Sequence, residues 1–364
     1  MQKKQGISLI VLSITILVMA ILAATAIIAL EDSGIIGRSK NTVSKQNQQE
    51  EYTRLQVIKN GILTDNFGEI TVDEFIEELK SQGVIEETIT TDEYGSTVVK
   101  TKLGFDVYIS QDGEENVKIS FEQIIPPQPL GSLITSAADY GKTVDYTVTV
   151  NGITYNDWRI YYYNNDYVYL ISASSIGNTT LDKGTTVASL TSDELALYEK
   201  FRVGTADKYT LIDISTDGNN YTMYNCQAVA QLIKDYANFA NTTTYGTNVV
   251  GAIGGPTLEL LAAGWNAKEY TPTMTLTTDT YGYKINGATY VSGLTSDGLY
   301  VPSDYWYWLA SPSASNAYNV MIAGYGDVGS SNYGNANGVR PVVCLKSSIP
   351  ATVGTGDYDF SLTK

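Results

Sequence analysis

Histidine is absent from this sequence of 364 residues. Its absence excludes the commonest general base, the histidine ligands of zinc and the base of a serine triad. Cysteine is almost as rare, because Cys226 and Cys344 are the only two and neither belongs to a CxxC pair. We therefore expect no metal site, no redox centre and no cofactor. The two cysteines are predicted either to form one disulfide outside the cell or to remain buried thiols.

Charge is also scarce and mostly negative. Charged residues make up 17% of the chain, with 39 acidic against 23 basic residues, which gives a formal net charge of −16. A surface this acidic repels phosphate backbones, so nucleic acid is not expected as a partner. The sequence has no GxSxG elbow, and no two of its carboxylates stand out as a catalytic pair. We predict that the protein is not an enzyme.

One long uncharged segment lies near the N-terminus, at residues 7–30. As a helix it would be about 36 Å long, enough to cross a hydrocarbon core of about 30 Å. Lys3 and Lys4 precede it and favour a cytoplasmic N-terminus. We predict a transmembrane anchor helix at 7–30 and a single-pass cell-membrane protein with extracellular C-terminal domains. A cleaved secretory signal is the alternative.

The segment KKQGISLIVLSITILVMAILAATAIIAL resembles the N-terminus of type IV prepilins and pseudopilins. In that family a short basic leader ends in glycine, and a peptidase cuts just after it. The resemblance implies a leader at residues 1–6, processing between Gly6 and Ile7, and assembly with other pilin-like subunits in a pilus. Val11 stands where classical pilins have a glutamate, which favours a variant pilin-like protein over a bulk subunit. Without the family, Gly6 is simply a residue beside the apolar helix.

Residues 31–124 are predicted to form a stalk helix followed by a small α+β module. An apolar stripe at helical spacing indicates that the helix continues beyond the anchor. Thr71 and Glu74 form a capping box that opens a short helix, with Gly83 as its stop. Alternating segments at 96–101, 104–110 and 116–121 predict a small antiparallel sheet. The residues of the stripe are Tyr52, Leu55, Ile58 and Ile62.

Three prolines between residues 125 and 131 predict a stiff linker, which we take as the domain boundary. Beyond it, 132–349 alternates strand-like runs with a helix near 225–238, and 350–364 is predicted to be a C-terminal tail. The predicted fold class is α+β: a long N-terminal transmembrane and stalk helix, a small pilin-like module, and a larger α+β domain.

Several stretches of the larger domain carry a second resemblance. ADYGKTVDYTV, AIGGPTLELLAAGWN, YWLASP and GVRPVVCL resemble a domain of Firmicutes surface proteins that is related to the C-type-lectin-like fold of formylglycine-generating enzymes. The resemblance implies that the last strand closes onto the first and that one loop-rich face binds ligands. Catalysis is not implied, because neither cysteine lies in a matching motif. The EPN, QPD and WND signatures of calcium-dependent lectins are absent, so calcium is not implied either.

Residues 313–337 lie between the YWLASP and GVRPVV blocks, and 21 of these 25 are Ser, Ala, Asn, Tyr, Gly or Asp. Tyrosines spaced by small residues are typical of binding surfaces, whereas the alternative is a Gly/Asn-rich loop without a ligand. All six residue types arise from an asparagine codon altered at its adenines, as in proteins varied by diversity-generating retroelements. The candidate ligand-binding residues are Ser313, Ser315, Asn316, Tyr318, Asn319, Tyr325, Asp327, Ser330, Ser331, Asn332, Tyr333, Asn335 and Asn337.

Four further residues are assigned structural roles. Arg340 is expected to point into the domain toward a carboxylate, with Glu259 as the candidate partner. Trp306 and Trp308 are expected in the core. We predict a surface-displayed, pilin-like adhesin whose C-terminal domain binds an extracellular protein or glycan. The alternative is a minor pilin or pseudopilin with a structural role in a type IV pilus or secretion filament.

Overall fold

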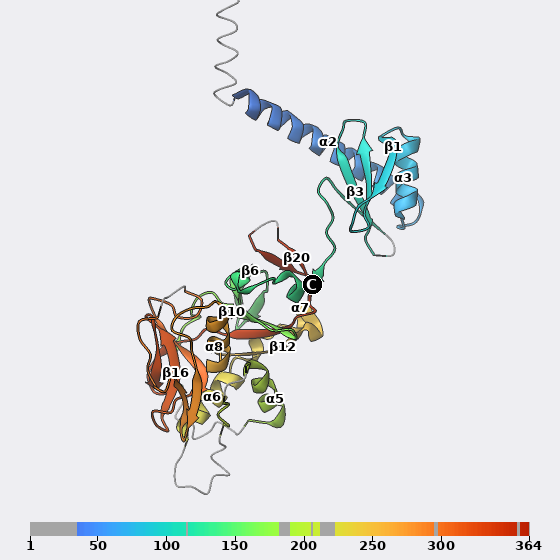
Figure 1. Ribbon diagram of the computed structural model, residues 1–364. Helices are drawn as coiled ribbons and strands as arrows, with labels where there is room; N and C mark the ends of the chain where they lie inside the picture. The colour runs from blue at the N-terminus through green and yellow to red at the C-terminus, as the bar shows by residue number, and fades with distance from the viewer. Residues whose placement is uncertain are drawn as a thin grey trace, which may run out of the picture. The chain divides into compact units, whose positions relative to one another are not determined.

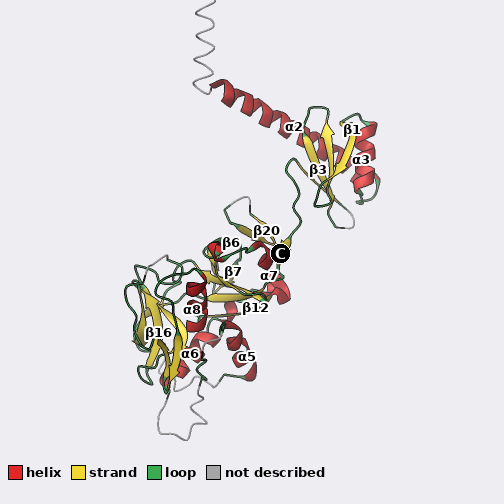
Figure 2. Cartoon of the chain, viewed as in Figure 1, coloured by secondary structure: helices red, strands yellow, loops and turns green. Residues whose placement is uncertain are grey.

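The computed structural model describes residues 35–113, 116–181, 190–204, 207–211, 223–294, 298–354 and 357–363, with side chains from residue 45 onward. The chain divides into two compact units, Met1–Ile125 and Pro126–Lys364 (Figures 1 and 2). The division falls at the start of the proline-rich stretch.

The first unit combines two helices with a four-stranded antiparallel sheet in the order β1-β2-β3-β4. Leu55 and Ile58 of the long helix are buried in its core, and Tyr52 and Ile62 pack against that core. The predicted apolar stripe is therefore confirmed. The elements are α2 (Ile35–Asp65), α3 (Val72–Ser81), β1 (Ile85–Thr91), β2 (Thr97–Thr101), β3 (Asp106–Gln111) and β4 (Val117–Ser120).

The predicted capping box begins α3. The Thr71 hydroxyl accepts a hydrogen bond from the Glu74 N–H, and the Glu74 carboxylate accepts one from the Thr71 N–H. Two backbone donors that the helix cannot satisfy internally are thereby paired. Gly83 follows the end of the helix with a φ of 63°, a left-handed conformation that glycine adopts without strain.

The predicted fold class and localisation need correction. Strands predominate over short helices in the described residues, and none of the helices there is long and apolar enough to cross a membrane. The one long helix, α2, carries charged side chains such as Lys45, Arg54 and Lys59 along its length. A fold led by a transmembrane helix and a single-pass membrane localisation are both contradicted. The segment 7–30 and the processing residues Gly6 and Ile7 lie outside the described residues.

The second unit is built around an eight-stranded sheet in the order β12-β19-β10-β9-β6-β21-β20-β5. Its central strands β9 and β10 are the predicted runs WRIYYY and YVYLIS, and β19 pairs with β10 from Tyr167↔Lys346 to Ile171↔Val342. The strands are β5 (Gln128–Pro129), β6 (Thr143–Val144), β9 (Trp158–Tyr163), β10 (Tyr167–Ser172), β12 (Val249–Ile253), β19 (Val342–Lys346), β20 (Pro350–Val353) and β21 (Phe360–Leu362).

A five-stranded sheet in the order β11-β18-β15-β16-β17 forms a second layer of this unit. Two short hairpins accompany the two sheets. The five strands are β11 (Asn178–Thr179), β15 (Trp306–Pro312), β16 (Asn319–Gly324), β17 (Asp327–Asn332) and β18 (Asn337–Gly338), and the hairpins pair β7 (Val148–Val150) with β8 (Ile153–Tyr155) and β13 (Leu276–Asp279) with β14 (Gly282–Ile285).

Two helices lie between the sheets. α6 contacts β12 and β15, and α8 contacts β9 and β15 (Figures 1 and 2). The sequence of α8, LELLAAGWNA, is apolar on nearly every side, as expected for a helix covered all round. The helices are α4 (Leu130–Leu133), α5 (Ser192–Phe201), α6 (Tyr224–Lys234), α7 (Thr242–Tyr245), α8 (Leu258–Ala267), η1 (Ala137–Asp139), η2 (Ala237–Phe239) and η3 (Gly246–Asn248).

The linker and the tail are shorter than predicted. β5, inside the predicted linker, pairs with β20, and Leu130 is buried in the core. β20 and β21, inside the predicted tail, pair with each other, and β21 pairs with β6. The first two strands of the unit, β5 and β6, therefore pair with its last two, β20 and β21.

Tyrosine is largely a core residue in this unit. Each buried ring fills the interior, while its hydroxyl can donate to a backbone carbonyl that would otherwise be unpaired. Much of the tyrosine content is thus explained by packing rather than by ligand binding. The donors and acceptors are Tyr146 to Phe239 O (2.7 Å), Tyr169 to Lys200 O (2.6 Å), Tyr198 to Ala310 O (2.7 Å), Tyr300 to Tyr161 O (2.7 Å) and Tyr307 to Tyr300 O (2.7 Å).

Candidate functional site

The predicted variable segment 313–337 is mainly a β-hairpin rather than a loop. β16 and β17 pair from Asn319↔Asn332 to Gly324↔Asp327, and residues 325 and 326 form the turn. Tyr325 (φ 50°) and Gly326 (φ 77°) are both left-handed, as a type I′ hairpin turn requires. The interior of the hairpin is buried, because Val320, Met321, Ile322 and Ala323 pack into the core.

Alternation along the strands assigns the polar residues of the hairpin to two faces. The register places Asn319 and Ser330 on one face. There the Asn319 amide donates to Ser315 Oγ (3.0 Å), and Ser315 Oγ lies 3.4 Å from Ser330 Oγ. Ser313, which is fully buried, donates to Ser315 Oγ (3.1 Å) and completes this small network.

The other face carries a stack of three tyrosines at the open end of the hairpin. The rings of Tyr224 and Tyr318 are nearly parallel, 5.4 Å apart between centroids and inclined by 17°. Tyr333 lies 5.9 Å from Tyr224 and 6.4 Å from Tyr318. Tyr318 remains 46% exposed, whereas Tyr333 is only 8% exposed. The half-exposed ring of Tyr318 therefore contacts the rings of Tyr224 and Tyr333.

Backbone hydrogen bonds fix the stack. The Tyr333 N–H donates to Tyr318 O (3.1 Å), which extends the hairpin ladder by one pair. The Asn225 N–H donates to Ala317 O (2.9 Å), and its side-chain amide donates to Asn316 O (3.2 Å), so the start of α6 is tied to the turn before Tyr318. Tyr224, at the first position of α6, is thereby held against Tyr318.

A second polar network lies on the same face as the tyrosines. Ser331 Oγ accepts hydrogen bonds from the side-chain amides of Asn335 (3.1 Å) and Asn337 (3.3 Å). Asn335 is exposed and Asn337 is buried. We call Tyr224, Tyr318 and Tyr333, with Ser331, Asn335 and Asn337, the tyrosine face.

The remaining candidate residues lie elsewhere. Tyr325 is 54% exposed but sits at the turn, about 24 Å along the strand from Tyr318 at about 3.4 Å per residue. Its ring contacts Trp306, which is only half-buried and not the full core residue that we predicted, unlike Trp308. Asp327 accepts hydrogen bonds from the Tyr290 hydroxyl and the Gly293 N–H.

The thirteen predicted residues thus do not form one surface. Ser313, Tyr333 and Asn337 are buried. Asn332 is exposed, but the register places it on the face opposite the tyrosines. Tyr224 is the member of the tyrosine face that the sequence analysis missed, since 94 residues separate it from Tyr318 along the chain and nothing local marks it.

The two hairpin tyrosines should respond differently to truncation. Tyr333→Ala removes a buried ring and should lower the stability of the second unit by about 3–5 kcal/mol. Tyr318→Ala removes a half-exposed ring and should cost less than about 1 kcal/mol. Thermal unfolding followed by tryptophan fluorescence measures both, and equal losses would contradict the assignment of Tyr318 to the surface.

We predicted that Arg340 pairs with Glu259, but the structure does not place these two side chains together. Arg340 is fully buried and donates to four backbone carbonyls, with its guanidinium 5.2 Å from the Tyr307 ring centroid. It lies between β18 and β19, beside the end of β10. The acceptors are Ser172 O (3.0 Å), Ala173 O (3.2 Å), Gly298 O (3.2 Å) and Leu299 O (2.8 Å).

Glu259 pairs instead with Arg202, which follows α5. Arg202 Nε lies 2.9 Å from Glu259 Oε1, and the Tyr283 hydroxyl donates to the same oxygen. Arg202 Nη2 donates in turn to Tyr283 Oη (2.9 Å). Burial, together with the charge of Glu259, raises the pKa of Tyr283 well above its ordinary value. The three side chains form a buried structural network.

The two cysteines are free thiols, so the disulfide alternative is not supported. Cys226 lies in α6 and Cys344 in β19, and both are buried. Burial raises the pKa of the Cys344 thiol far above its usual range. A buried thiol of this kind behaves as a small apolar residue.

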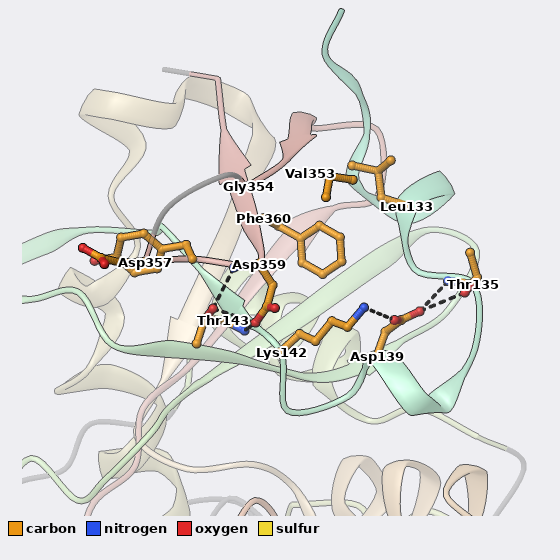
Figure 3. Close-up of a pocket in the computed structure, with 11 residues that line it drawn as sticks. Leu133, Thr135, Asp139, Lys142, Thr143, Val353, Gly354, Asp357, Asp359 and Phe360 are labelled. Atoms are coloured by element: carbon orange, nitrogen blue, oxygen red, sulfur yellow. Dashed lines mark hydrogen bonds and ion pairs between the residues drawn. The ribbon is translucent and has the colours of Figure 1, made fainter. Parts of the chain in front are cut away.

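A cavity of about 550 Å³ lies where the β20–β21 hairpin meets the start of the unit (Figure 3). Among the residues that line it, Lys142 forms an ion pair with Asp139, with 2.6 Å between Nζ and Oδ1. The Asp359 carboxylate accepts hydrogen bonds from the N–H (2.8 Å) and the hydroxyl (2.7 Å) of Thr143. The Thr143 N–H holds the pKa of Asp359 below its ordinary value. Lys142, Asp139 and Asp359 are already paired within the protein, so we assign them a structural role in holding the β20–β21 hairpin in place rather than a role in ligand binding.

Among the described residues, no group of three acidic or cysteine side chains is placed to hold a metal ion. Comparison with known protein families, with curated proteins and with solved structures gave no match to this chain. The two family resemblances therefore stay predictions. The geometry of the tyrosine face is what can support a function.

Proposed function

We propose that the second unit is a recognition module that binds a protein or glycan ligand through the tyrosine face. The observation that carries the proposal is the half-exposed ring of Tyr318, stacked at 17° on Tyr224. Leaving so large an apolar ring accessible is unfavourable in water, and covering it with a ligand recovers that free energy.

The surroundings of the ring suit a binding site. Tyr318 is held by the Tyr333 N–H and by the tie between Asn225 and residues 316 and 317, so a ligand meets a ring that is already positioned. Binding to a preorganised surface avoids the entropy of ordering a loop. Ser331 and Asn335, on the same face, supply hydrogen-bonding groups that can fix the orientation of the ligand.

Binding to a glycan array and to an array of extracellular proteins tests the proposal. The full chain is compared with Tyr318→Ala, with Asn335→Ala and with Tyr325→Ala. Tyr325 is the matched control, because it is an equally exposed tyrosine of the same hairpin at its far end. We expect the first two variants to lose the signals of the parent protein and the third to keep them. Signals that survive Tyr318→Ala, or vanish equally with Tyr325→Ala, would contradict the proposal.

A further inference from the structure

We propose that the ligand seated on Tyr318 is a neutral saccharide, bound without a metal ion. This inference rests on the proposed function of the tyrosine face and specifies its ligand class. It follows from the aromatic ring that the tyrosine face exposes, from the charge of the residues of this face and from the hydrogen-bonding groups that these residues leave free.

The most exposed ring of the tyrosine face is that of Tyr318, which is 46% exposed. Tyr224, which is partly buried, stacks on this ring at a centroid distance of 5.4 Å, and the buried Tyr333 lies 5.9 Å from Tyr224 and 6.4 Å from Tyr318. A pyranose presents a flat array of C–H groups on one side and hydroxyls at its edge. Such a ring covers one tyrosine face completely, whereas an aliphatic or aromatic side chain of a protein partner is normally enclosed on several sides.

The six residues of the tyrosine face are all uncharged residue types. Asp327, the acidic residue of the hairpin, lies at the far end and accepts hydrogen bonds from Tyr290 and Gly293. Among the described residues that make up this face, an anionic sugar would find no cation, and a cationic ligand would find no carboxylate. A neutral ligand can bind there without a countercharge, because it has no charge whose desolvation must be compensated.

The hydrogen-bonding groups of the tyrosine face, and of Asn316 next to Tyr318 in the chain, match the hydroxyls of a saccharide, which both donate and accept. Ser331 Oγ already accepts two amide N–H groups, which directs its own hydrogen outward as a donor. Asn335 uses its amide nitrogen on Ser331, which leaves its carboxamide oxygen as an acceptor. Asn316 accepts the Tyr318 N–H with its carboxamide oxygen (2.8 Å), which leaves its amide nitrogen as a donor. Protein groups alone can therefore satisfy the ligand.

A protein partner fits this face less well. Stable protein interfaces bury about 800 Å² on each side and depend on a cluster of aromatic or arginine anchors. The tyrosine face offers one half-exposed anchor, Tyr318, and the other exposed tyrosine of the hairpin, Tyr325, is about 24 Å away along the strand at about 3.4 Å per residue. A polypeptide ligand is the competing outcome of the experiment below.

Affinity electrophoresis of the full chain tests the inference with yeast mannan, dextran and galactan as neutral probes and with polygalacturonate and heparin as acidic ones. We expect at least one neutral polysaccharide to retard the protein, with EDTA making no difference. Tyr318→Ala should weaken this retardation about tenfold or more, as expected for the loss of an aromatic contact. Tyr318→Phe, which keeps the ring, and Tyr325→Ala should retain it.

Failure of the inference is distinguishable from failure of the proposed function. Tyr318-dependent binding to array proteins that persists after enzymatic deglycosylation would leave the recognition module in place and overturn the saccharide. Retardation by the acidic probes only, or retardation abolished by EDTA, would also overturn it. The absence of any Tyr318-dependent binding, on the arrays and in the gels, would overturn both.

Discussion

Arg340→Ala should destabilise the second unit by about 4 kcal/mol or more, enough to lower its melting temperature by about 10 °C or more. The side chain is fully buried and bonds four backbone carbonyls from two separate segments, 172–173 and 298–299. Its removal takes away these four buried hydrogen bonds and also opens a cavity beside Tyr307.

Arg340→Lys should recover only part of this loss. The lysine ammonium places its three donors at one point, whereas the planar guanidinium spreads its donors over four carbonyls. The chain offers a simple readout, because its four tryptophans, Trp158, Trp265, Trp306 and Trp308, all lie in the second unit. Their fluorescence therefore follows the unfolding of that unit within the full chain.

Arg159→Ala is the matched control for Arg340. Arg159 lies in β9 with a side chain that is 38% exposed, and it pairs with an exposed carboxylate of Asp157 at 3.3 Å. Surface pairs of this kind contribute little to stability. A loss for Arg340→Ala no larger than the loss for Arg159→Ala would show that the four carbonyl contacts do not hold the two segments together.

Glu259→Gln should cost the same unit about 3 kcal/mol, because the buried Arg202 guanidinium then keeps only the half-exposed carboxylate of Glu199 as its countercharge. Both side chains are nearly inaccessible, at 0% for Glu259 and 5% for Arg202. Glu259 Oε2 is buried and lacks a hydrogen-bond partner among the described residues, so the pair is held through Oε1 alone. The tryptophan signal again measures the change.

A double variant separates the pair from its surroundings. Arg202→Met together with Glu259→Gln removes both charges, so its loss should be smaller than the sum of the two single losses. Asp279→Asn, which affects an exposed pair with Lys284, is the control and should leave the melting temperature unchanged. Strictly additive losses would show that Arg202 and Glu259 are not coupled.

Local sequence signals predicted local structure well. The stripe from Tyr52 to Ile62 and the capping box at Thr71 were recognised because each depends on residues within a few positions of one another. The core strands β9 and β10 were recognised for the same reason, since runs such as WRIYYY are rich in residues that favour strands.

Predictions that needed tertiary partners failed or stayed incomplete. The partner of Glu259 turned out to be Arg202 rather than Arg340, because the sequence shows that a buried charge needs compensation but not which residue provides it. The hairpin at 319–332 was not predicted, since its small and polar residues have weak strand propensity and pairing decides its structure. Tyr224 was missed because only the tie through Asn225 brings it to Tyr318.

The composition of the hairpin misled in a specific way. Tyrosine, serine and asparagine suggested a continuous displayed surface, yet alternation along two strands divides them between two faces and buries several of them. What remains accessible beside the tyrosine stack is small: Tyr318, Asn335 and part of Ser331. A pattern of residue types can indicate that a segment suits binding, but its strand register decides which of those residues a ligand can reach.

The pairing of β5 with β20 and of β6 with β21 has a consequence for biosynthesis. A nascent chain leaves the ribosome from its N-terminus, so β5 and β6 must wait for more than 200 residues to be translated before their partners emerge. Such distant contacts slow folding, and the unpaired strand edges are exposed in the meantime. The second unit can therefore complete its largest sheet only after β20 and β21 have been translated.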